Sequence, residues 1–265
     1  MRRLLIPLLL LIPLRAALAE ALWETLPPTP PPVAGEQTGH AKVNGISLYY
    51  ATIGHGSPVV LLHGGLANSD YWGEQVKALA PHHMVILMDS RGHGRSTRDA
   101  RPCGYDLMAD DVVGLLDTLH IAKADVVGWS DGAILGLDLA LRHPDRVGRI
   151  FAFAANTQTA GVQDAVEKNP TFARYIVRAG REYARLSPTP KDYDAFVAQI
   201  SKMWEAPVWV VDGDHDEAIR RAHTEYIAST IPGAGLLILP NTSHFAFLQD
   251  PALFNAVPLN FLRDR

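Results

Sequence analysis

Ser130 has the sequence context of a catalytic nucleophile. It stands in Gly128-Trp129-Ser130-Asp131-Gly132, between a short apolar run and a segment with helical spacing. This is the setting of a nucleophile elbow, a sharp strand-to-helix turn that raises a serine hydroxyl above the sheet edge. Flanking glycines relieve crowding in such a turn, and the first N–H groups of the helix face any anion formed there. The motif predicts a nucleophile; the alternative is a glycine-rich turn with a solvated serine.

A serine hydroxyl needs a base within hydrogen-bond reach, and His244 is the candidate. It follows the apolar run 236–239 by a short turn. A carboxylate must hold the histidine in the right tautomer. Three aspartates, Asp212, Asp214 and Asp216, stand after one predicted strand, and chemistry alone does not choose between them. We expect no metal here, because the run lacks the later ligands and the Glu of an EF-hand.

Apolar runs alternate with helical periodicities along the chain, which predicts an α/β fold with a mostly parallel, doubly wound sheet. Asn-Gly at 44–45 predicts a hairpin. The further predicted strands are 58–62, 84–88, 124–128, 149–154, 207–211 and 236–239. The helices between them include 105–120, the segment after the elbow, 217–231 and a closing helix from about Pro251.

The alternation stops after Ala155. Two helical stretches follow, 171–186 and 191–204, and Ser-Pro-Thr-Pro separates them. We expect Thr189 to cap the second helix and Pro190 to be its first residue. A helical insertion after the sixth strand predicts a small lid, residues 156–206, over the site.

Length, charge and cysteine content exclude several classes of function. The chain has 265 residues, 24 Lys and Arg against 28 Asp and Glu, and a net charge of -4. No basic stripe offers itself to nucleic acid, and no run is long enough for a stable membrane span. The single cysteine, Cys103, excludes an intramolecular disulfide. The oligomeric state stays open.

The N-terminus predicts export. A basic start, an apolar run at 4–14 and Ala17-Leu18-Ala19 indicate a signal peptide over residues 1–19, hence a secreted or periplasmic protein. The alternative is an uncleaved interfacial anchor. Prolines between 27 and 32 indicate a stiff linker over residues 20–39 that spaces the domain, 40–265, from whatever precedes it.

The order of these parts resembles the α/β-hydrolase superfamily, serine hydrolase branch, from about residue 39 to the C-terminus. Each motif alone is modest, but together they keep the superfamily's chain order of nucleophile, acid and histidine. The motifs are His63-Gly64-Gly65, Asp89-x-Arg91-Gly92-x-Gly94-x-Ser96, Gly128-x-Ser130-x-Gly132, and Gly213-x-x-Asp216 followed by His244.

The resemblance assigns further roles. Its Gly-x-x-Asp spacing selects Asp216 as the triad acid, with Asp214 as the runner-up. Backbone N–H groups of Gly65 and Asp131 are the expected oxyanion hole, and Leu66 can replace or supplement Gly65. The candidate substrate-binding residues adjoin these positions in the sequence: Leu66, Trp129, Asp131 and Phe245. No cofactor is implied.

Asp131 limits the range of candidate substrates. The Gly-Trp-Ser-Asp-Gly elbow is similar to that of the valacyclovir hydrolase family and bacterial relatives, where the acid is thought to bind the amino group of an amino-acid ester. A carboxylate beside a developing oxyanion is unfavourable unless a cation neutralises it, so the resemblance implies a cationic small-molecule ester. The alternative is an aspartate favoured by the helix dipole and directed away from the pocket.

The sequence thus predicts a serine esterase that works through an acyl-enzyme on Ser130, with His244 as general base and acid and Asp216 orienting it. Serine at the elbow argues against haloalkane dehalogenases and epoxide hydrolases, whose nucleophile there is an aspartate. A C–C bond hydrolase or a peptidase on the same triad is the first alternative. A catalytically silent fold that binds a ligand is the second.

Overall fold

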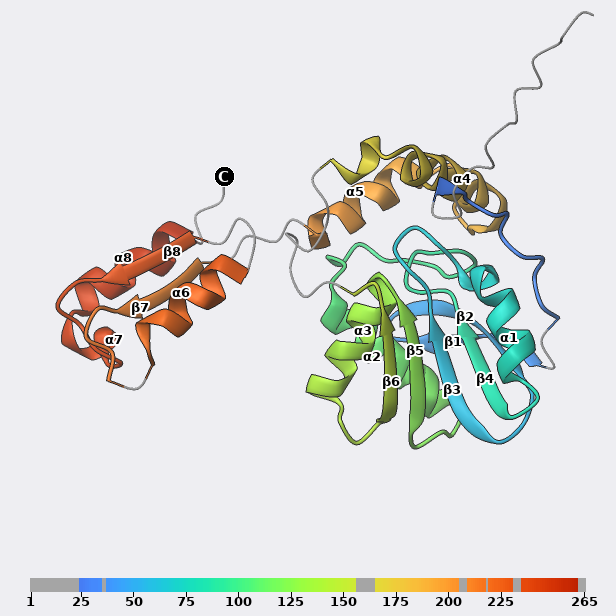
Figure 1. Cartoon of the computed structure of the whole chain (residues 1–265), viewed down its shortest axis with the longest axis horizontal. Coiled ribbons are helices and arrows are strands. Elements are labelled where there is room, and N and C mark those ends of the chain that lie inside the picture. The colour runs from blue at the N-terminus through green and yellow to red at the C-terminus, as the bar shows by residue number, and fades with distance from the viewer. Residues whose placement is uncertain are drawn as a thin grey trace, which may run out of the picture.

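A computed structural model describes the chain, with the elements shown in Figure 1. The described residues are 24–34, 37–155, 165–204, 209–217, 219–230 and 235–261. The predicted signal peptide lies outside them, as does the first part of the predicted lid, 156–164.

A six-stranded, mostly parallel sheet forms the centre of the main body. In spatial order its strands are β1 (Gln37–Val43), β2 (Ile46–Ile53), β4 (His83–Met88), β3 (Ser57–Leu62), β5 (Ala124–Trp129) and β6 (Val147–Phe153). The first two strands form the predicted hairpin, with Val43 opposite Ile46. Asn44 and Gly45 turn it at positive φ, 41° and 81°, which this residue pair tolerates. From β4 to β6 neighbouring strands run parallel.

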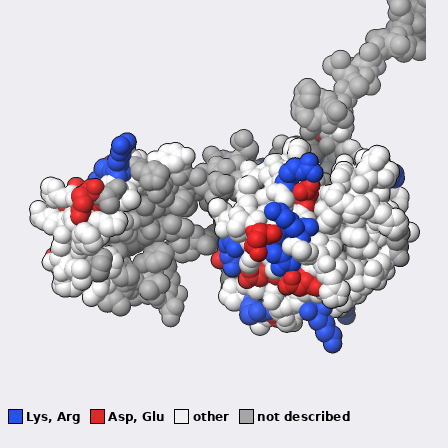
Figure 2. Space-filling view, turned by 90° about the horizontal axis from the view of Figure 1, so that it is seen from below, with Lys and Arg blue, Asp and Glu red and all other residues white. Residues whose placement is uncertain are grey.

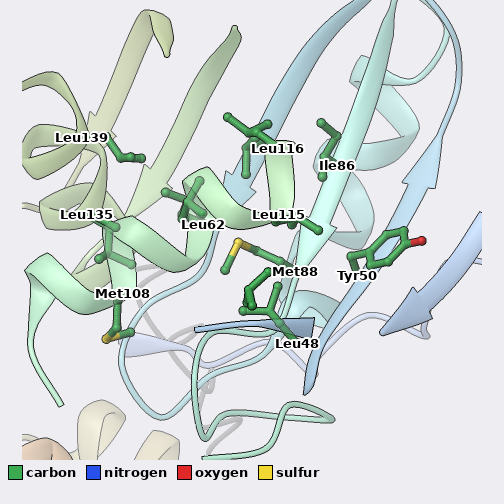
Figure 3. Close-up of a cluster of buried hydrophobic side chains, with 14 of the residues drawn as sticks. Leu48, Tyr50, Leu62, Ile86, Met88, Met108, Leu115, Leu116, Leu135 and Leu139 are labelled. Carbon is green, nitrogen blue, oxygen red and sulfur yellow. The ribbon is translucent and has the colours of Figure 1, made fainter. Parts of the chain in front are cut away.

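Helices cover both faces of this sheet. The 3-10 turn η2 (Ser69–Trp72) and α1 (Gly73–Leu79) lie on one face, and α2 (Tyr105–Thr118) and α3 (Asp131–Arg142) on the other. Figure 3 shows the larger core, between the sheet and α2 and α3. Its fully buried members include Leu62, Leu115 and Leu135. The continuous apolar runs at the ends of β3 and β4 are buried on both faces of the sheet, as the sequence predicted.

Two helices follow β6, α4 (Pro170–Leu186) and α5 (Tyr193–Trp204). Asn169 caps α4 by accepting hydrogen bonds from the N–H groups of its first turn. The predicted start of α5 is wrong by three residues. Thr189 contacts the Tyr183 hydroxyl at 3.1 Å instead, and the chain turns once more before α5 begins at Tyr193.

The helix α5 is held above the loop that follows β4. Phe196 is fully buried there, stacked on Tyr183 and edge-on to His93. Gln199 donates to the carbonyl oxygens of Asp99 and Arg101. These contacts fix the position of α5, the helix that precedes the next strand.

The C-terminal unit forms a sheet of its own (Figure 1). It contains β7 (Trp209–Gly213), α6 (Arg221–Thr230), β8 (Gly235–Leu239), α7 (Ala246–Gln249) and α8 (Pro251–Phe261). Within the described part of the chain, β7 and β8 pair in parallel only with each other, and β6 is the edge of the larger sheet. The sequence predicted instead that both strands extend that sheet.

A short connector explains the difference. Residues 205–208 alone separate α5 from β7, and such a connector spans at most about 17 Å. A strand that pairs in parallel with β6 must start at the amino end of the sheet, whereas α5 lies at the carboxyl end. The two ends are about 16 Å apart, which is the length of the five-residue strand β7. The four-residue connection is therefore only just long enough to let β7 start beside the first residue of β6.

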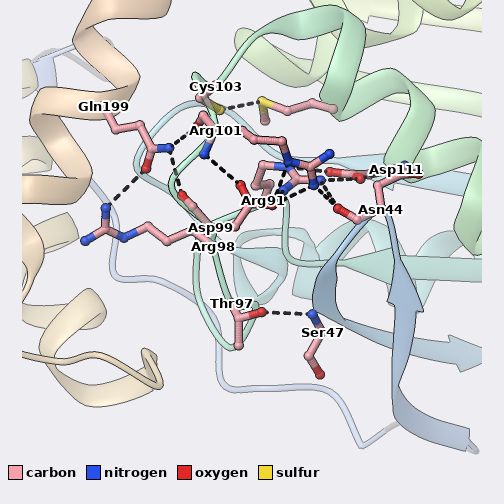
Figure 4. A network of polar contacts seen from close by, with 11 residues as sticks. Asn44, Ser47, Arg91, Thr97, Arg98, Asp99, Arg101, Cys103, Asp111 and Gln199 are labelled. Carbon is pink, nitrogen blue, oxygen red and sulfur yellow. Dashed lines mark hydrogen bonds and ion pairs between the residues drawn. The ribbon is translucent and has the colours of Figure 1, made fainter.

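A buried ion pair ties the loop after β4 to α2, and Asn44 of the hairpin is hydrogen-bonded to it (Figure 4). The side chain of Arg91 is 1% exposed and donates to both carboxylate oxygens of Asp111, at 2.9 and 2.7 Å. Asn44 also donates to Asp111, and Asp99 approaches the other side of the guanidinium. One arginine thus joins three segments of the chain, which gives this loop a structural role.

The surface carries charges of both signs. On the face in Figure 2, basic and acidic side chains are interspersed among the described residues. No helix within the described ranges is both long and apolar enough to cross a membrane.

Replacing Asp111 by Ala should lower the free energy of unfolding by about 3–5 kcal/mol, because it leaves a buried guanidinium without its carboxylate. Urea denaturation measures the change. Asp117 is the matched control: it pairs with Arg146, but its side chain is 65% exposed, so Asp117→Ala should cost about 1 kcal/mol or less. Equal losses in the two variants would contradict the structural role of the buried pair.

Candidate active site

Ser130 lies on a strained turn between β5 and α3. Its φ and ψ are 54° and -122°, outside the regions that residues with a side chain favour. Its N–H donates to the carbonyl oxygen of Phe153 at 2.9 Å, which anchors the turn to β6. A Cβ on Gly132 would lie 2.0 Å from the carbonyl oxygen of Leu62, and one on Gly128 would lie 2.3 Å from that of Gly132. Only glycine fits both positions, so the structure has the predicted elbow.

The loop after β3 lies against this turn. A Cβ on Gly64 would be 3.1 Å from the Cβ of Ser130, so the two segments are in contact. Leu66 has a positive φ of 65°. Asp131 is the first residue of α3, at the end of the helix where backbone N–H groups face outward. The elements that carry the predicted oxyanion donors, Gly65 and Asp131, thus meet beside Ser130.

His63 supports the oxyanion loop rather than taking part in proton transfer. Its Nδ1 lies 2.8 Å from the carbonyl oxygen of Gly64, and its Nε2 accepts a hydrogen bond from the N–H of Ser90 at 2.9 Å. These two bonds need the neutral ring with the proton on Nδ1. Complete burial lowers the pKa of His63, which also favours the neutral form.

Asp89 joins the loops behind the site. One carboxylate oxygen accepts from the N–H and hydroxyl of Ser69, and the other from the N–H and guanidinium of Arg95. A Cβ on Gly94 would lie 2.2 Å from this carboxylate. The loop motif that the sequence singled out therefore acts by holding the backbone.

Trp129 and Asp131 flank the nucleophile in different surroundings. Trp129 stacks on Tyr71 and meets Tyr175 edge-on, with centroids 5.8 and 6.0 Å apart. Asp131 is buried and accepts a hydrogen bond from the Tyr105 hydroxyl at 3.1 Å. Its carboxylate is thus enclosed by protein.

Tyr175 was not predicted as a site residue. It comes from α4, is buried, and its hydroxyl donates to the carbonyl oxygen of Gly65. No local motif marks it, because the contact joins residues 110 positions apart.

The acid and base halves of the predicted triad lie in the C-terminal unit. Nδ1 of His244 is 3.0 Å from Oδ2 of Asp216, whose side chain is 5% exposed. Asp214, the runner-up, instead accepts from the N–H of Thr242, and backbone hydrogen bonds from Asn241 and Thr242 lower its pKa. The geometry pairs the histidine with Asp216.

Two neighbours complete this half. Glu217 accepts from the backbone N–H of His244 at 3.2 Å, a contact that the sequence analysis did not predict. Phe245, a predicted substrate-binding residue, is half-exposed, with its ring edge-on to His244.

The structure therefore places the predicted site in two halves. Ser130, the oxyanion segments and Trp129 belong to the six-stranded body, whereas Asp216, His244 and Phe245 belong to the C-terminal unit (Figure 1). Among the described residues, no hydrogen bond joins His244 to Ser130. In the part of the chain that the structure describes, no three His, Cys, Asp or Glu side chains cluster so that they could hold a metal ion.

Cys103, the single thiol of the chain, lies outside both halves. It is buried, with its Sγ 3.5 Å from the sulfur of Met108. Burial raises its pKa to about 11, so the reactive thiolate is scarce at neutral pH.

A serine on a strand-to-helix elbow, on a mostly parallel sheet with helices on both faces, defines a serine hydrolase of the α/β class. The sequence matches the α/β hydrolase fold family over residues 57–187. It is 47% identical over 245 residues to RutD of Caulobacter segnis, provisionally named a carbamate hydrolase, covering 78% of this chain and 92% of that one. It is 27% identical over 266 residues to mouse serine hydrolase BPHL, covering 89% and 91%. The chain belongs to the α/β-hydrolase family.

A solved structure agrees on the fold. The meta-cleavage product hydrolase of Pseudomonas fluorescens IP01 matches with a TM-score of 0.52 and 22% identity, covering 85% of this chain and 96% of that one. At this identity, the likeness speaks for the fold alone.

The buried histidines predict a pH dependence of stability. Burial lowers the pKa of His93 to about 3, below its ordinary 6.5, so the native protein keeps it neutral while the unfolded chain protonates it. The free energy of unfolding should therefore fall as pH drops from 6.5 toward 3, by up to about 1.4 kcal/mol per pH unit for this residue. Urea denaturation at pH 6.5 and 5 should show a shallower fall for His93→Asn. The exposed His82 is the control, and His82→Asn should match the wild type; equal slopes in all three proteins would refute the assignment.

Proposed function

We propose that the protein is a serine hydrolase that cleaves carboxylic esters of small molecules without a cofactor, and that the predicted signal peptide exports it. The strained Ser130 turn carries the proposal, because such a backbone persists only where the surrounding structure enforces it. The Asp216–His244 pair supplies the base that a serine nucleophile needs. Together these two features support acyl transfer to water.

The reaction requires the C-terminal unit to dock beside β6. The N–H of Ser130 donates to the carbonyl of Phe153, so the peptide groups of Phe153 face β5 and those of Ala152 face the other edge. Phe151 and Phe153 are 64% and 60% exposed on this strand. Docking β7 in parallel there, with its connector extended, would cover apolar surface and bring His244 to the edge that carries Ser130.

In the docked site, each residue has a defined role. The Ser130 oxygen attacks the ester carbonyl while His244 takes its proton, and Asp216 stabilises the imidazolium. The N–H groups of Gly65 and Asp131 bind the oxyanion. His244 then gives the proton to the leaving alcohol, and an acyl-enzyme remains. Water attacks the acyl-enzyme by the same route and releases the acid.

The first test is hydrolysis of p-nitrophenyl acetate and butyrate by protein starting at Glu20. Ser130→Ala and His244→Ala should each lower kcat at least about 1,000-fold, since members of a triad act as one unit. Asp216→Asn should lose most of the activity, whereas Asp214→Asn should keep most of it. Loss in Ser130→Ala with full activity in His244→Ala would refute docking, and unchanged turnover in Ser130→Ala would refute the nucleophile.

We also propose that Asp131 favours a substrate with a cationic amine. Asp131 directly follows Ser130 in the chain, and a buried carboxylate close to a developing oxyanion is unfavourable unless a cation neutralises it. Asp131→Ala should raise KM for amino-acid esters at least about 10-fold, and for neutral esters of the same size much less. Tyr105→Phe is the control that keeps the carboxylate but removes its hydrogen bond. Equal effects of Asp131→Ala on both ester classes would refute the proposal.

Carbamate hydrolysis is the second candidate, favoured by the 47% identity to RutD. It uses the same nucleophile and oxyanion hole, so a panel of esters, carbamates, amides and C–C substrates decides between the classes. A fluorophosphonate label on Ser130 separates all of them from a silent binding fold, which should not react.

A further inference from the structure

The proline-rich segment before β1 packs on the main body. Residues 24–32, called here the N-terminal strap, run along α4. Arg178 donates to the carbonyl oxygens of Pro27 and Leu26, at 2.7 and 3.0 Å. The hydroxyl of Thr171 donates to the carbonyl oxygen of Glu24 at 2.8 Å. Prolines lack N–H groups, so carbonyl oxygens are the hydrogen-bonding groups that such a segment offers.

The strap also joins α4 to the loops of the sheet. Glu182, a buried residue of α4, accepts from the Thr29 hydroxyl at 2.6 Å and from the Asn68 side chain at 3.2 Å. Pro30 lies against the start of α1, where a Cβ on Gly73 would be 2.6 Å from the Pro30 Cβ. The strap thus bridges the inserted helices and the body, and it follows the predicted cleavage site.

A cavity of about 950 Å³ lies between the strap, α1 and α4. Proline rings and aromatic side chains form much of its lining: Pro28, Pro30, Tyr71, Trp129, Phe172 and Tyr175. This volume is at the upper end of the range for small-molecule sites, and an apolar, aromatic lining suits a bulky apolar group.

The cavity shares its walls with the predicted reaction centre. Trp129 is covalently next to Ser130, and the hydroxyl of Tyr175 donates to the carbonyl of Gly65 in the oxyanion loop. A group held between these two side chains therefore lies next to both the nucleophile turn and the oxyanion segment.

We propose that the N-terminal strap is the outer wall of a pocket for an apolar or aromatic acyl group, so that a segment outside the sheet sets the acyl selectivity. The inference rests on the proposed ester hydrolysis and adds the acyl class. Small acyl groups such as acetyl do not reach the strap, so changes in the strap do not affect their hydrolysis.

Gly73→Ala tests the strap directly. Gly73 has helical φ and ψ, -52° and -39°, so alanine suits the backbone, and its Cβ displaces Pro30. We expect the ratio of kcat/KM for p-nitrophenyl 4-phenylbutyrate to that for the acetate to fall at least about 5-fold through KM, while turnover of the acetate is unchanged. Gly104→Ala is the control, because nothing lies within 4 Å of the added Cβ.

A second pair of variants removes the anchor. Arg178→Ala deletes both bonds to the strap and should lower the same ratio, whereas Arg181→Ala, an exposed arginine of the same helix, should not. Gly73→Ala and Arg178→Ala should be non-additive, since both act through one segment. An unchanged ratio, or an equal loss for both esters, would overturn the proposal.

Binding measurements keep this test independent of turnover. In Ser130→Ala protein, calorimetry should show 4-phenylbutyrate binding at least about 5-fold more weakly once Gly73→Ala is added, by the same loss of the pocket wall. Weaker binding without Ser130-dependent turnover in the wild type would contradict the ester hydrolysis and leave the pocket standing. Ser130-dependent turnover with unchanged binding would support the ester hydrolysis and contradict the proposed pocket.

Discussion

The close approach of α3 to the end of β3 is the contact on which the site depends. With no Cβ on Gly132, the first turn of α3 lies against the carbonyl oxygen of Leu62, where any other residue would overlap it. This contact sets Ser130 in its strained turn and brings the loop after β3 beside it. His63 and Asp89 then hold that loop from behind through backbone hydrogen bonds. Backbone packing therefore positions both Ser130, the predicted nucleophile, and the segment of the predicted oxyanion hole.

Local features of the fold could be predicted from the sequence because they depend on neighbours in the chain. Asn44-Gly45 turns the hairpin, and continuous apolar runs form the buried strands. The elbow needs only two glycines around Ser130. The pairing of His244 with Asp216 follows from two strand ends meeting at one edge, and the structure has it at 3.0 Å.

Long-range features could not be predicted in the same way. The proline-rich segment has the composition of a spacer, yet Arg174 and Arg178, about 150 positions away, donate to carbonyl oxygens of residues 24–27. Tyr175 reaches the oxyanion loop from α4 with no motif to mark it. The apolar pattern of β7 predicts a buried strand but does not indicate which sheet the strand joins. Connector length decides that, and residues 205–208 leave it little reach.

The predicted site is divided between two units, so the proposed reaction needs an association within the fold. Phe151 and Phe153 on β6 are apolar surface that docking would remove from water. The shortness of the four-residue connection 205–208 opposes this gain, because docking requires the chain there to be fully extended. In the proposed reaction, the balance between these two effects sets the fraction of molecules that have His244 beside Ser130.

The isolated thiol has a practical consequence for observing that balance. Cys103 is the single cysteine of the chain, and its burial and raised pKa make it a poor target for thiol reagents. Cysteines introduced on the surface can therefore be modified selectively in an otherwise native background. A fluorophore pair placed on β6 and β8 would report the separation of the two units molecule by molecule. Distances between the two units can therefore be measured by fluorescence without first removing a native cysteine.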